Sequence, residues 1–233
     1  MQLPVKIPFV LFLFIFLLQA CKKSEVTVSN CNIGFTNVSP DAGPLDFLVN
    51  ANVISGGLTY AASSGYVSTV PGTYSMQLTN TGSSDALFSF TGTLTTGKYY
   101  SLYAIDSLSR IRPIIIEDNF IADTARAKAR FFQFSPGLAK VDMMIKPTEK
   151  DTSFNKATGR TFNDQDTTNT FQNFDAFTAD TCNVTVWRSK DSVVLAEKKN
   201  YIFKKSKLYT LLLTGTDTAA SSTRRLTIQI TEH

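Results

Sequence analysis

Histidine is almost absent from this sequence: among 233 residues there is one, His233, at the end of the chain where no neighbouring motif positions it. Histidine is the side chain that most often acts as a general base or a metal ligand near neutral pH. A Gly-x-Ser-x-Gly elbow, a glycine-rich phosphate loop and a paired-histidine motif are also missing. The sequence therefore argues against the common hydrolases and metalloenzymes, and it predicts no metal site and no cofactor.

Long apolar runs are scarce as well. The longest, Phe9–Leu18, has ten residues, which at about 1.5 Å per residue span roughly 15 Å, half of a bilayer's hydrocarbon core. A run of this length that follows a positive charge, here Lys6, is typical of a signal peptide and too short for a membrane span. We therefore expect residues 1–20 to be a signal peptide.

The segment Leu18-Gln19-Ala20-Cys21 ends this run. It resembles the lipobox of bacterial lipoproteins, in which the cysteine receives a diacylglycerol and becomes the new N-terminus. The alternative is an ordinary secreted protein with a chance cysteine at its cleavage point. We predict that Cys21 is lipidated, that residues 21–30 form a tether, and that the lipid holds the protein on a membrane. Lys22 stands where aspartate would signal inner-membrane retention, which favours the outer membrane, facing either the periplasm or the cell surface.

Charged residues are few, 18% of the chain, and they are unevenly placed. Residues 28–120 hold 3 basic and 6 acidic residues, a net charge of −3, whereas residues 121–233 hold 17 and 12, a net charge of +5. This basic half is too weakly charged, and too interspersed with acids, to indicate nucleic acid binding. We expect no nucleic acid partner and a monomer.

No long stretch of the sequence has the periodicity of a helix. Instead, short segments of alternating apolar and polar residues lie between turns rich in Gly, Pro, Asn, Asp or Ser. Such spacing is typical of an all-β sandwich or barrel. In Thr73–Thr79, for example, Tyr74, Met76 and Leu78 fall on one face. The sequence predicts an all-β fold of two tandem Ig-like antiparallel β-sandwich domains after the signal peptide.

An internal repeat sets the domain boundary. The pattern of Phe35–Val49 returns 96 residues later as Phe131–Ile145, with the Phe, Ser-Pro and Asp positions identical. A second echo links Gly97–Tyr103 to Ser206–Leu212 at an offset of 109. We therefore expect one sandwich over residues 31–120 and a degenerate copy over residues 121–233, whose extra 13 residues fall mostly in the polar stretch 146–173.

Three segments carry a family resemblance: Val38–Val49, with its Ser-Pro-Asp-Ala turn and apolar-Asp-apolar strand, Ser68–Tyr74, with Pro-Gly-Thr-Tyr, and Gly97–Tyr100, with Gly-Lys-Tyr-Tyr. They resemble the domain of unknown function DUF4397 over residues 31–120, and more weakly over 126–233. The resemblance implies a β-rich, extracytoplasmic protein, often a lipoprotein. It implies no established activity or ligand.

Asp46 and Asp142 occupy equivalent positions in the two copies. A pair of carboxylates can hydrolyse a glycosidic bond, so they are the natural candidates for catalysis. The simpler interpretation is structural: each Asp follows a Ser-Pro turn by six residues, where its carboxylate can accept backbone N–H bonds and fix the turn. We favour structural turn carboxylates and predict no catalytic residue.

Four weaker signals each have a simpler alternative. The oxygen-rich run Asn163–Asn169 could hold calcium but lacks the Gly and Glu of an EF-hand, so a solvated loop is favoured. Cys31 and Cys182 could pair across the copies, but we favour free thiols. Thr124, in Asp123-Thr124-Ala125, resembles a bacterial O-glycosylation signal. A lysine cluster could bind an anionic sugar or a lipid headgroup, but it more often protects a sheet edge. Its members are Lys198, Lys199, Lys204, Lys205 and Lys207.

Two function classes follow from these observations. The first is a non-catalytic cell-envelope lipoprotein that displays its sandwiches to bind a glycan, a peptide or a protein, or that acts as a spacer. The alternative is a carboxylate-dependent polysaccharide hydrolase or an accessory protein of polysaccharide uptake. The sequence favours the first class, and it does not identify the ligand.

Overall fold

The computed structural model describes residues 29–150, 152, 155–217 and 224–233. The signal peptide 1–20, the lipidation residue Cys21 and the tether as far as residue 28 lie outside the described residues. Within the part that is described, no helix is both long and apolar enough to cross a bilayer.

The first half of the chain forms eight strands in two sheets, the first sandwich. The strand order is β4-β1-β7-β8 in one sheet and β3-β2-β5-β6 in the other. The strands are β1 Cys31–Asn37, β2 Leu45–Val49, β3 Asn52–Leu58, β4 Ser63–Thr69, β5 Gly72–Asn80, β6 Ala86–Leu94, β7 Tyr99–Ile105 and β8 Arg112–Asp118, with a 3₁₀ turn η2 at Leu108–Arg110.

The second half forms the second sandwich with the same topology. Its sheets are β12-β9-β15-β16 and β11-β10-β13-β14, so each strand matches the first-half strand numbered eight lower. The strands are β9 Ala127–Gln133, β10 Val141–Pro147, β11 Asn155–Arg160, β12 Asp175–Phe177, β13 Thr181–Arg188, β14 Val194–Ile202, β15 Leu208–Thr214 and β16 Thr227–Glu232, with 3₁₀ turns η3 Asp164–Asp166 and η4 Asn169–Gln172. The predicted all-β fold of tandem sandwiches is confirmed.

Local structure departs from the sequence prediction in two ways. One strand pair in each sandwich is parallel, β1 with β7 and β9 with β15, where antiparallel pairing throughout was expected. Of the five strands between β1 and β7, β4 pairs with β1, while β2, β3, β5 and β6 form the other sheet, and this long connection allows the parallel pairing. Strand spacing in the second copy predicts a strand over residues 170–177, but this segment forms the turn η4 followed by the three-residue strand β12.

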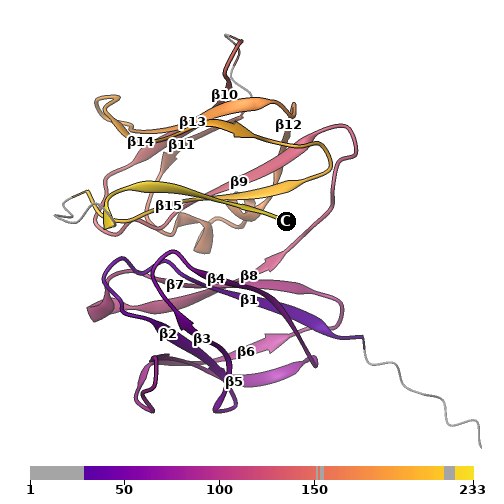
Figure 1. Cartoon of the computed structure of the whole chain (residues 1–233), viewed down its shortest axis with the longest axis vertical. Coiled ribbons are helices and arrows are strands. Elements are labelled where there is room, and N and C mark those ends of the chain that lie inside the picture. The colour runs from indigo at the N-terminus through magenta and orange to yellow at the C-terminus, as the bar shows by residue number, and fades with distance from the viewer. Residues whose placement is uncertain (1–28, 151, 153–154, 218–223) are drawn as a thin grey trace, which may run out of the picture.

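Each sandwich has its own core, and a third core lies between them. The inner sheets β4-β1-β7-β8 and β12-β9-β15-β16 face each other in the middle of a four-layered stack (Figure 1). Alternate residues of β7 therefore face opposite ways: Leu102 packs in the first core, whereas Tyr103 packs against Phe132 and Phe134 of β9 and its C-terminal end. Strands β7 and β15 are apolar on both faces because both faces are buried.

Candidate functional site

Asp46 lies on β2 and is almost fully buried. One carboxylate oxygen, Oδ1, accepts hydrogen bonds from the Gly57 amide at 2.7 Å and the Thr81 hydroxyl at 2.7 Å, and Oδ2 accepts one from the Gly82 amide at 3.2 Å. Burial, the largest effect, raises the pKa of Asp46, but the three hydrogen bonds together outweigh it and lower the pKa below its ordinary value. The carboxylate is thus fully used in holding two neighbouring segments.

Asp142 makes the equivalent bonds on β10. Its Oδ1 accepts hydrogen bonds from the Gly159 amide at 2.7 Å and from the Ser189 hydroxyl at 2.8 Å. Gly57 and Gly159 both have left-handed backbones, with φ of 69° and 64°, and the strand register shifts beside each aspartate. The sequence placed these bonds at the Ser-Pro turns; they run instead to a β-bulge in the neighbouring edge strand, which only glycine forms without strain.

The two aspartates are not brought together. Asp46 lies in the outer sheet of the first sandwich and Asp142 in the outer sheet of the second, at opposite sides of the four-layered stack. Two carboxylates that share a glycosidic substrate lie within about 10 Å of each other. Asp46 and Asp142 therefore each stabilise their own sandwich and do not form a shared site.

A pocket of about 210 Å³ opens on the second sandwich, between the edge strands β11 and β12. Its base is Arg160, whose guanidinium donates two hydrogen bonds, of 2.9 and 2.7 Å, to the Asp164 carboxylate. The same guanidinium lies 3.9 Å from the centre of the Phe171 ring and 5.6 Å from that of Phe131. An ion pair and two aromatic rings thus fix the floor of the pocket.

The rim of this pocket, hereafter the Phe171 pocket, is polar and exposed. None of its five rim side chains forms a hydrogen bond or ion pair with another described residue. They are Lys156, Thr158, Thr170, Asn173 and Asp175. Both donors and acceptors are therefore free to bind a polar ligand over an aromatic floor.

Sequence reasoning missed the Phe171 pocket because it predicts a solvated loop followed by a strand where the chain between β11 and β12 forms the turns η3 and η4. The run Asn163–Asn169 was expected to be a solvated loop. Instead it forms η3 and its flanks, with Asn163 and Gln165 buried. The described residues hold no cluster of three or more ligands suited to a metal ion. One signal in the sequence could have indicated this pocket: the second copy is 13 residues longer than the first, and Asn163–Asn169 lies in the stretch 146–173 that holds most of the extra length.

Residues 31–144 match the family described as domain of unknown function DUF4397. The protein carries a DUF4397 domain. The match covers the first sandwich and continues through β9 into β10, beyond the 31–120 segment that carried the sequence resemblance. No curated protein matches the chain.

Two solved structures are similar to this DUF4397 protein. One is the family CBM26 module CBMbc of Amy13K from Eubacterium rectale, in complex with maltoheptaose, with 12% identity and a TM-score of 0.24, covering 88% of this chain and 96% of the module. The other is a streptococcal virulence factor described as binding alpha-glucan, with 14% identity and a TM-score of 0.24, covering 82% and 94%. At such TM-scores the likeness carries no argument about the ligand of this chain.

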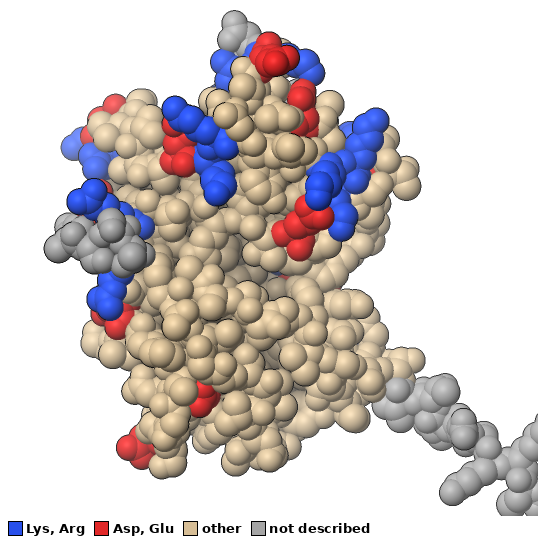
Figure 2. Space-filling view, viewed as in Figure 1, with Lys and Arg blue, Asp and Glu red and all other residues tan. Residues whose placement is uncertain are grey.

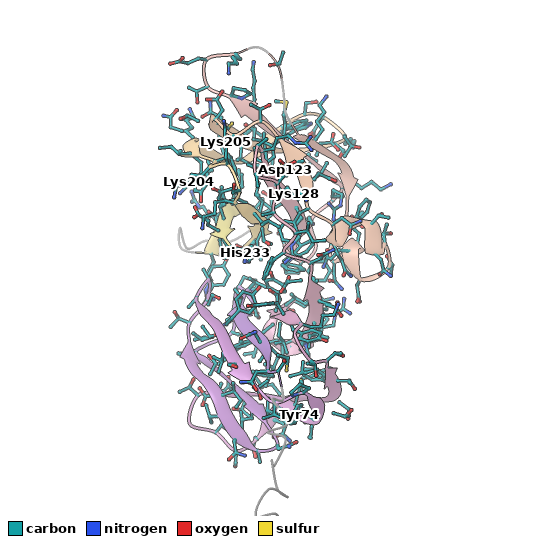
Figure 3. All side chains as sticks on the ribbon, turned by 90° about the vertical axis from the view of Figure 1, so that its right-hand side faces the viewer. Tyr74, Asp123, Lys128, Lys204, Lys205 and His233 are labelled. Atoms are coloured by element: carbon teal, nitrogen blue, oxygen red, sulfur yellow. The ribbon has the colours of Figure 1, made fainter. Side chains whose placement is uncertain are left out.

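His233 has a defined environment, although the sequence offered no motif to position it. Its ring stacks on Phe120 at 4.8 Å, and its Nε2 lies 2.9 Å from the Thr210 hydroxyl, close to where the two sandwiches meet (Figure 3). Burial first, and Arg130 second, lower the pKa of His233 to about 4, which Asp118 opposes. The imidazole is therefore neutral near pH 7 and packs as an aromatic ring.

The remaining candidates of the DUF4397 protein have simple surroundings. Thr124 is exposed in the linker between the sandwiches, where Asp123 caps the turn by accepting the Ala125 and Arg126 amides. Its glycosylation stays a prediction. Cys31 and Cys182 are buried as free thiols in different sandwiches, and burial raises the pKa of both, that of Cys182 to about 11.

Proposed function

We propose that this DUF4397 protein is a non-catalytic lipoprotein of the cell envelope, anchored in the outer membrane by a lipid on Cys21, and that it binds a glycan in the Phe171 pocket. The observation that carries the glycan proposal is the rim of five unpartnered polar side chains around an aromatic floor. The anchor rests on the lipobox-like residues that end at Cys21.

The chemistry of a sugar suits this arrangement. A pyranose presents an apolar ring face and a belt of hydroxyl groups that donate and accept hydrogen bonds. The Phe171 ring offers an apolar surface, while Lys156 donates, Asp175 accepts, and Asn173 does both. The volume of about 210 Å³ is below the roughly 300–1,000 Å³ of drug-sized pockets. The pocket therefore suits one end or one branch of a glycan.

The bonding of Asp46 and Asp142 supports a role without catalysis. Each carboxylate accepts hydrogen bonds from at least one backbone amide and one hydroxyl group of its own sandwich, and the two lie in separate outer sheets. A carboxylate-dependent hydrolase needs a second carboxylate on the opposite side of the scissile bond. No observation on the described residues favours the hydrolase alternative.

Removing the pocket's polar rim tests the glycan proposal. We expect Asn173→Ala combined with Asp175→Ala to weaken glycan binding at least tenfold, about 1.4 kcal/mol, because hydrogen bonds to the hydroxyl groups are lost. Binding is measured by isothermal titration with neutral oligosaccharides of glucose, mannose and N-acetylglucosamine. Asn52→Ala combined with Asp85→Ala removes an exposed amide and an exposed carboxylate from the first sandwich and is the matched control. Wild-type protein that binds none of these sugars, or a rim variant that binds as tightly as wild type, refutes the proposal.

Replacing the lipidated cysteine tests the anchor. We expect Cys21→Ser to abolish palmitate labelling and to move the protein from the membrane pellet to the soluble fraction or to leave the precursor unprocessed, because the thiol is the only acceptor of the diacylglycerol. Cys31→Ser is the control, since Cys31 is buried. Palmitate labelling that persists in Cys21→Ser rules the anchor out.

A further inference from the structure

Strand β6 is a long, uncharged and unprotected sheet edge. It has nine residues, Ala86–Leu94, and pairs only with β5, so the hydrogen-bonding groups along its other side have no strand partner among the described residues. From Phe88 to Leu94 the register with β5 is regular, and the one shift lies beyond Phe88 at the start of the strand. It contains no charged residue and no proline. Such an edge is a template for pairing with another strand.

The other seven edge strands formed by the described residues each carry a feature that discourages pairing. A left-handed glycine and a register shift distort β3, β4 and β11, whereas β12 is only three residues long. Strand β8 contains Pro113 and has charged residues at both ends, and β16 ends with the charged Glu232. These are the devices by which β-sheet proteins avoid edge-to-edge association.

The internal repeat supplies a direct comparison. Strand β14 is the counterpart of β6 in the second sandwich and has the same nine-residue length. It carries Glu197, Lys198 and Lys199 at its centre, where β6 has Ser89, Phe90 and Thr91. Figure 2 shows the same contrast over one face of the molecule, with charged side chains gathered on the second sandwich and few on the first. Charged residues thus discourage strand pairing at this edge of the second sandwich, whereas the same edge of the first sandwich has none.

We propose that β6 is an interface at which two copies of this chain pair edge to edge, antiparallel about Phe90, so that two four-stranded sheets become one of eight strands. A neutral strand meets no charge repulsion from a copy of itself, whereas β14 in the equivalent register would place Lys198 against Lys198. This dimer replaces the monomer expected from the sequence, and it does not depend on the glycan proposal or on the lipid anchor.

The residues of β6 are complementary in this register. Ser89 of one copy lies opposite Thr91 of the other, which extends the rows of hydroxyl side chains that already cross from β5 to β6 as Ser75–Thr91 and Thr73–Thr93. Phe88, which is 38% exposed at the rim of the sheet, lies opposite Gly92 of the second copy. The Met76 side chain already fills the space beside Gly92 within its own sandwich, and Gly92 presents no side chain that would clash with the Phe88 ring.

Disulfide trapping tests both the pairing and its register. We expect full-length Ser89→Cys/Thr91→Cys protein, extracted from membranes in mild detergent and oxidised, to run as a dimer on non-reducing gels. Each single variant should give less than a tenth of that dimer, because a cysteine at either position faces the other position. Glu197→Cys/Lys199→Cys on β14 is the matched control. The native thiols Cys31 and Cys182 are buried, so the wild-type chain sets the background.

A charge on the edge gives an independent measurement. Thr91→Lys should raise the dimer dissociation constant at least tenfold in sedimentation velocity, while the melting temperature of the protein diluted to the monomer stays that of the wild type. Asn52→Lys, on the opposite edge of the same sheet, should leave the dissociation constant unchanged. The proposal is overturned if the Ser89/Thr91 pair gives no more dimer than the β14 pair, if the single variants trap equally well, or if Thr91→Lys leaves the dissociation constant unchanged. These outcomes are the same whether or not Cys21 carries a lipid.

Discussion

Asp118→Ala is expected to lower the free energy of unfolding by about 3–5 kcal/mol, because it leaves the buried guanidinium of Arg130 without its counter-charge. The two side chains are fully buried between the sandwiches and form an ion pair, Arg130 Nη2 to Asp118 Oδ1, at 2.5 Å. Asp118 is the last residue of β8 and Arg130 lies on β9, so this pair ties the first sandwich to the second. Its loss should therefore weaken the contact between the two halves.

The cost is high because the pair belongs to a closed network. The second oxygen of Asp118 accepts hydrogen bonds from Tyr66 at 2.9 Å and from Ser101 at 2.8 Å. Arg130 also donates from Nε to the Thr210 hydroxyl at 2.9 Å. Burial first, and the Asp118 charge second, raise the pKa of Tyr66, so its hydroxyl stays a donor. Alanine at position 118 leaves several buried donors without an acceptor.

Urea denaturation at neutral pH measures this loss. Glu117→Ala is the matched control, since Glu117 neighbours Asp118 but pairs with Lys98 in solvent, and such exposed pairs contribute little. The double variant Asp118→Leu/Arg130→Met should recover much of the stability, because it removes both buried charges together. An Asp118→Ala protein no less stable than Glu117→Ala would show that the pair is dispensable.

The interface between the two sandwiches was not predicted from the sequence, because each sheet was assumed to have one face exposed to solvent. Alternation correctly assigned Tyr74, Met76 and Leu78 to the core of the first sandwich. In β7 and β15, however, the residues between the core positions are also buried, among them Tyr103 and Leu212, which pack in the core between the sandwiches. Nearly continuous apolar strands indicate burial on both faces, and this signal was present in both segments.

The Phe171 pocket was less accessible to sequence reasoning. Tandem sandwiches follow from local turn chemistry and from a repeat with a fixed offset, both of which are readable along the chain. The pocket depends on the contact between Arg160 and Phe171, which belong to segments with different structure, one a strand and the other the turn η4. No periodicity links such residues, so their contact is decided by tertiary packing.

Asp46→Asn and Asp142→Asn should each lower the free energy of unfolding by about 1–3 kcal/mol, the range for losing hydrogen bonds to a charged acceptor. Each carboxylate holds the amide of a left-handed bulge glycine, Gly57 or Gly159, together with one hydroxyl group. Because the two sites lie in different sandwiches and share no partner, the losses should add to within about 0.5 kcal/mol in the double variant.

The pH dependence of stability distinguishes the hydrogen bonds of the charged Asp46 carboxylate from an effect of side-chain packing. The pKa of Asp46 is lowered in the folded protein, so the carboxylate stabilises the fold fully above its unfolded pKa near 4 and loses that contribution as the pH falls through the folded pKa. The difference in unfolding free energy between wild type and Asp46→Asn should therefore shrink below about pH 4. A difference that stays constant down to pH 2 would show that the charge is not what Gly57 and Thr81 require.

The same variants decide between the two function classes. A structural aspartate loses stability when it is changed to asparagine and leaves ligand binding at the distant Phe171 pocket intact. A catalytic aspartate is commonly held at a cost in stability, so its removal leaves the melting temperature unchanged or raised while activity disappears. Urea denaturation and hydrolysis of a polysaccharide panel, measured on the same double variant, give opposite results for the two classes. If the wild type hydrolyses a polysaccharide and the double variant is equally stable but inactive, the non-catalytic role is overturned. The hydrogen bonds from Asp46 and Asp142 to the bulge glycines would then contribute nothing to stability, and the carboxylates would act in catalysis.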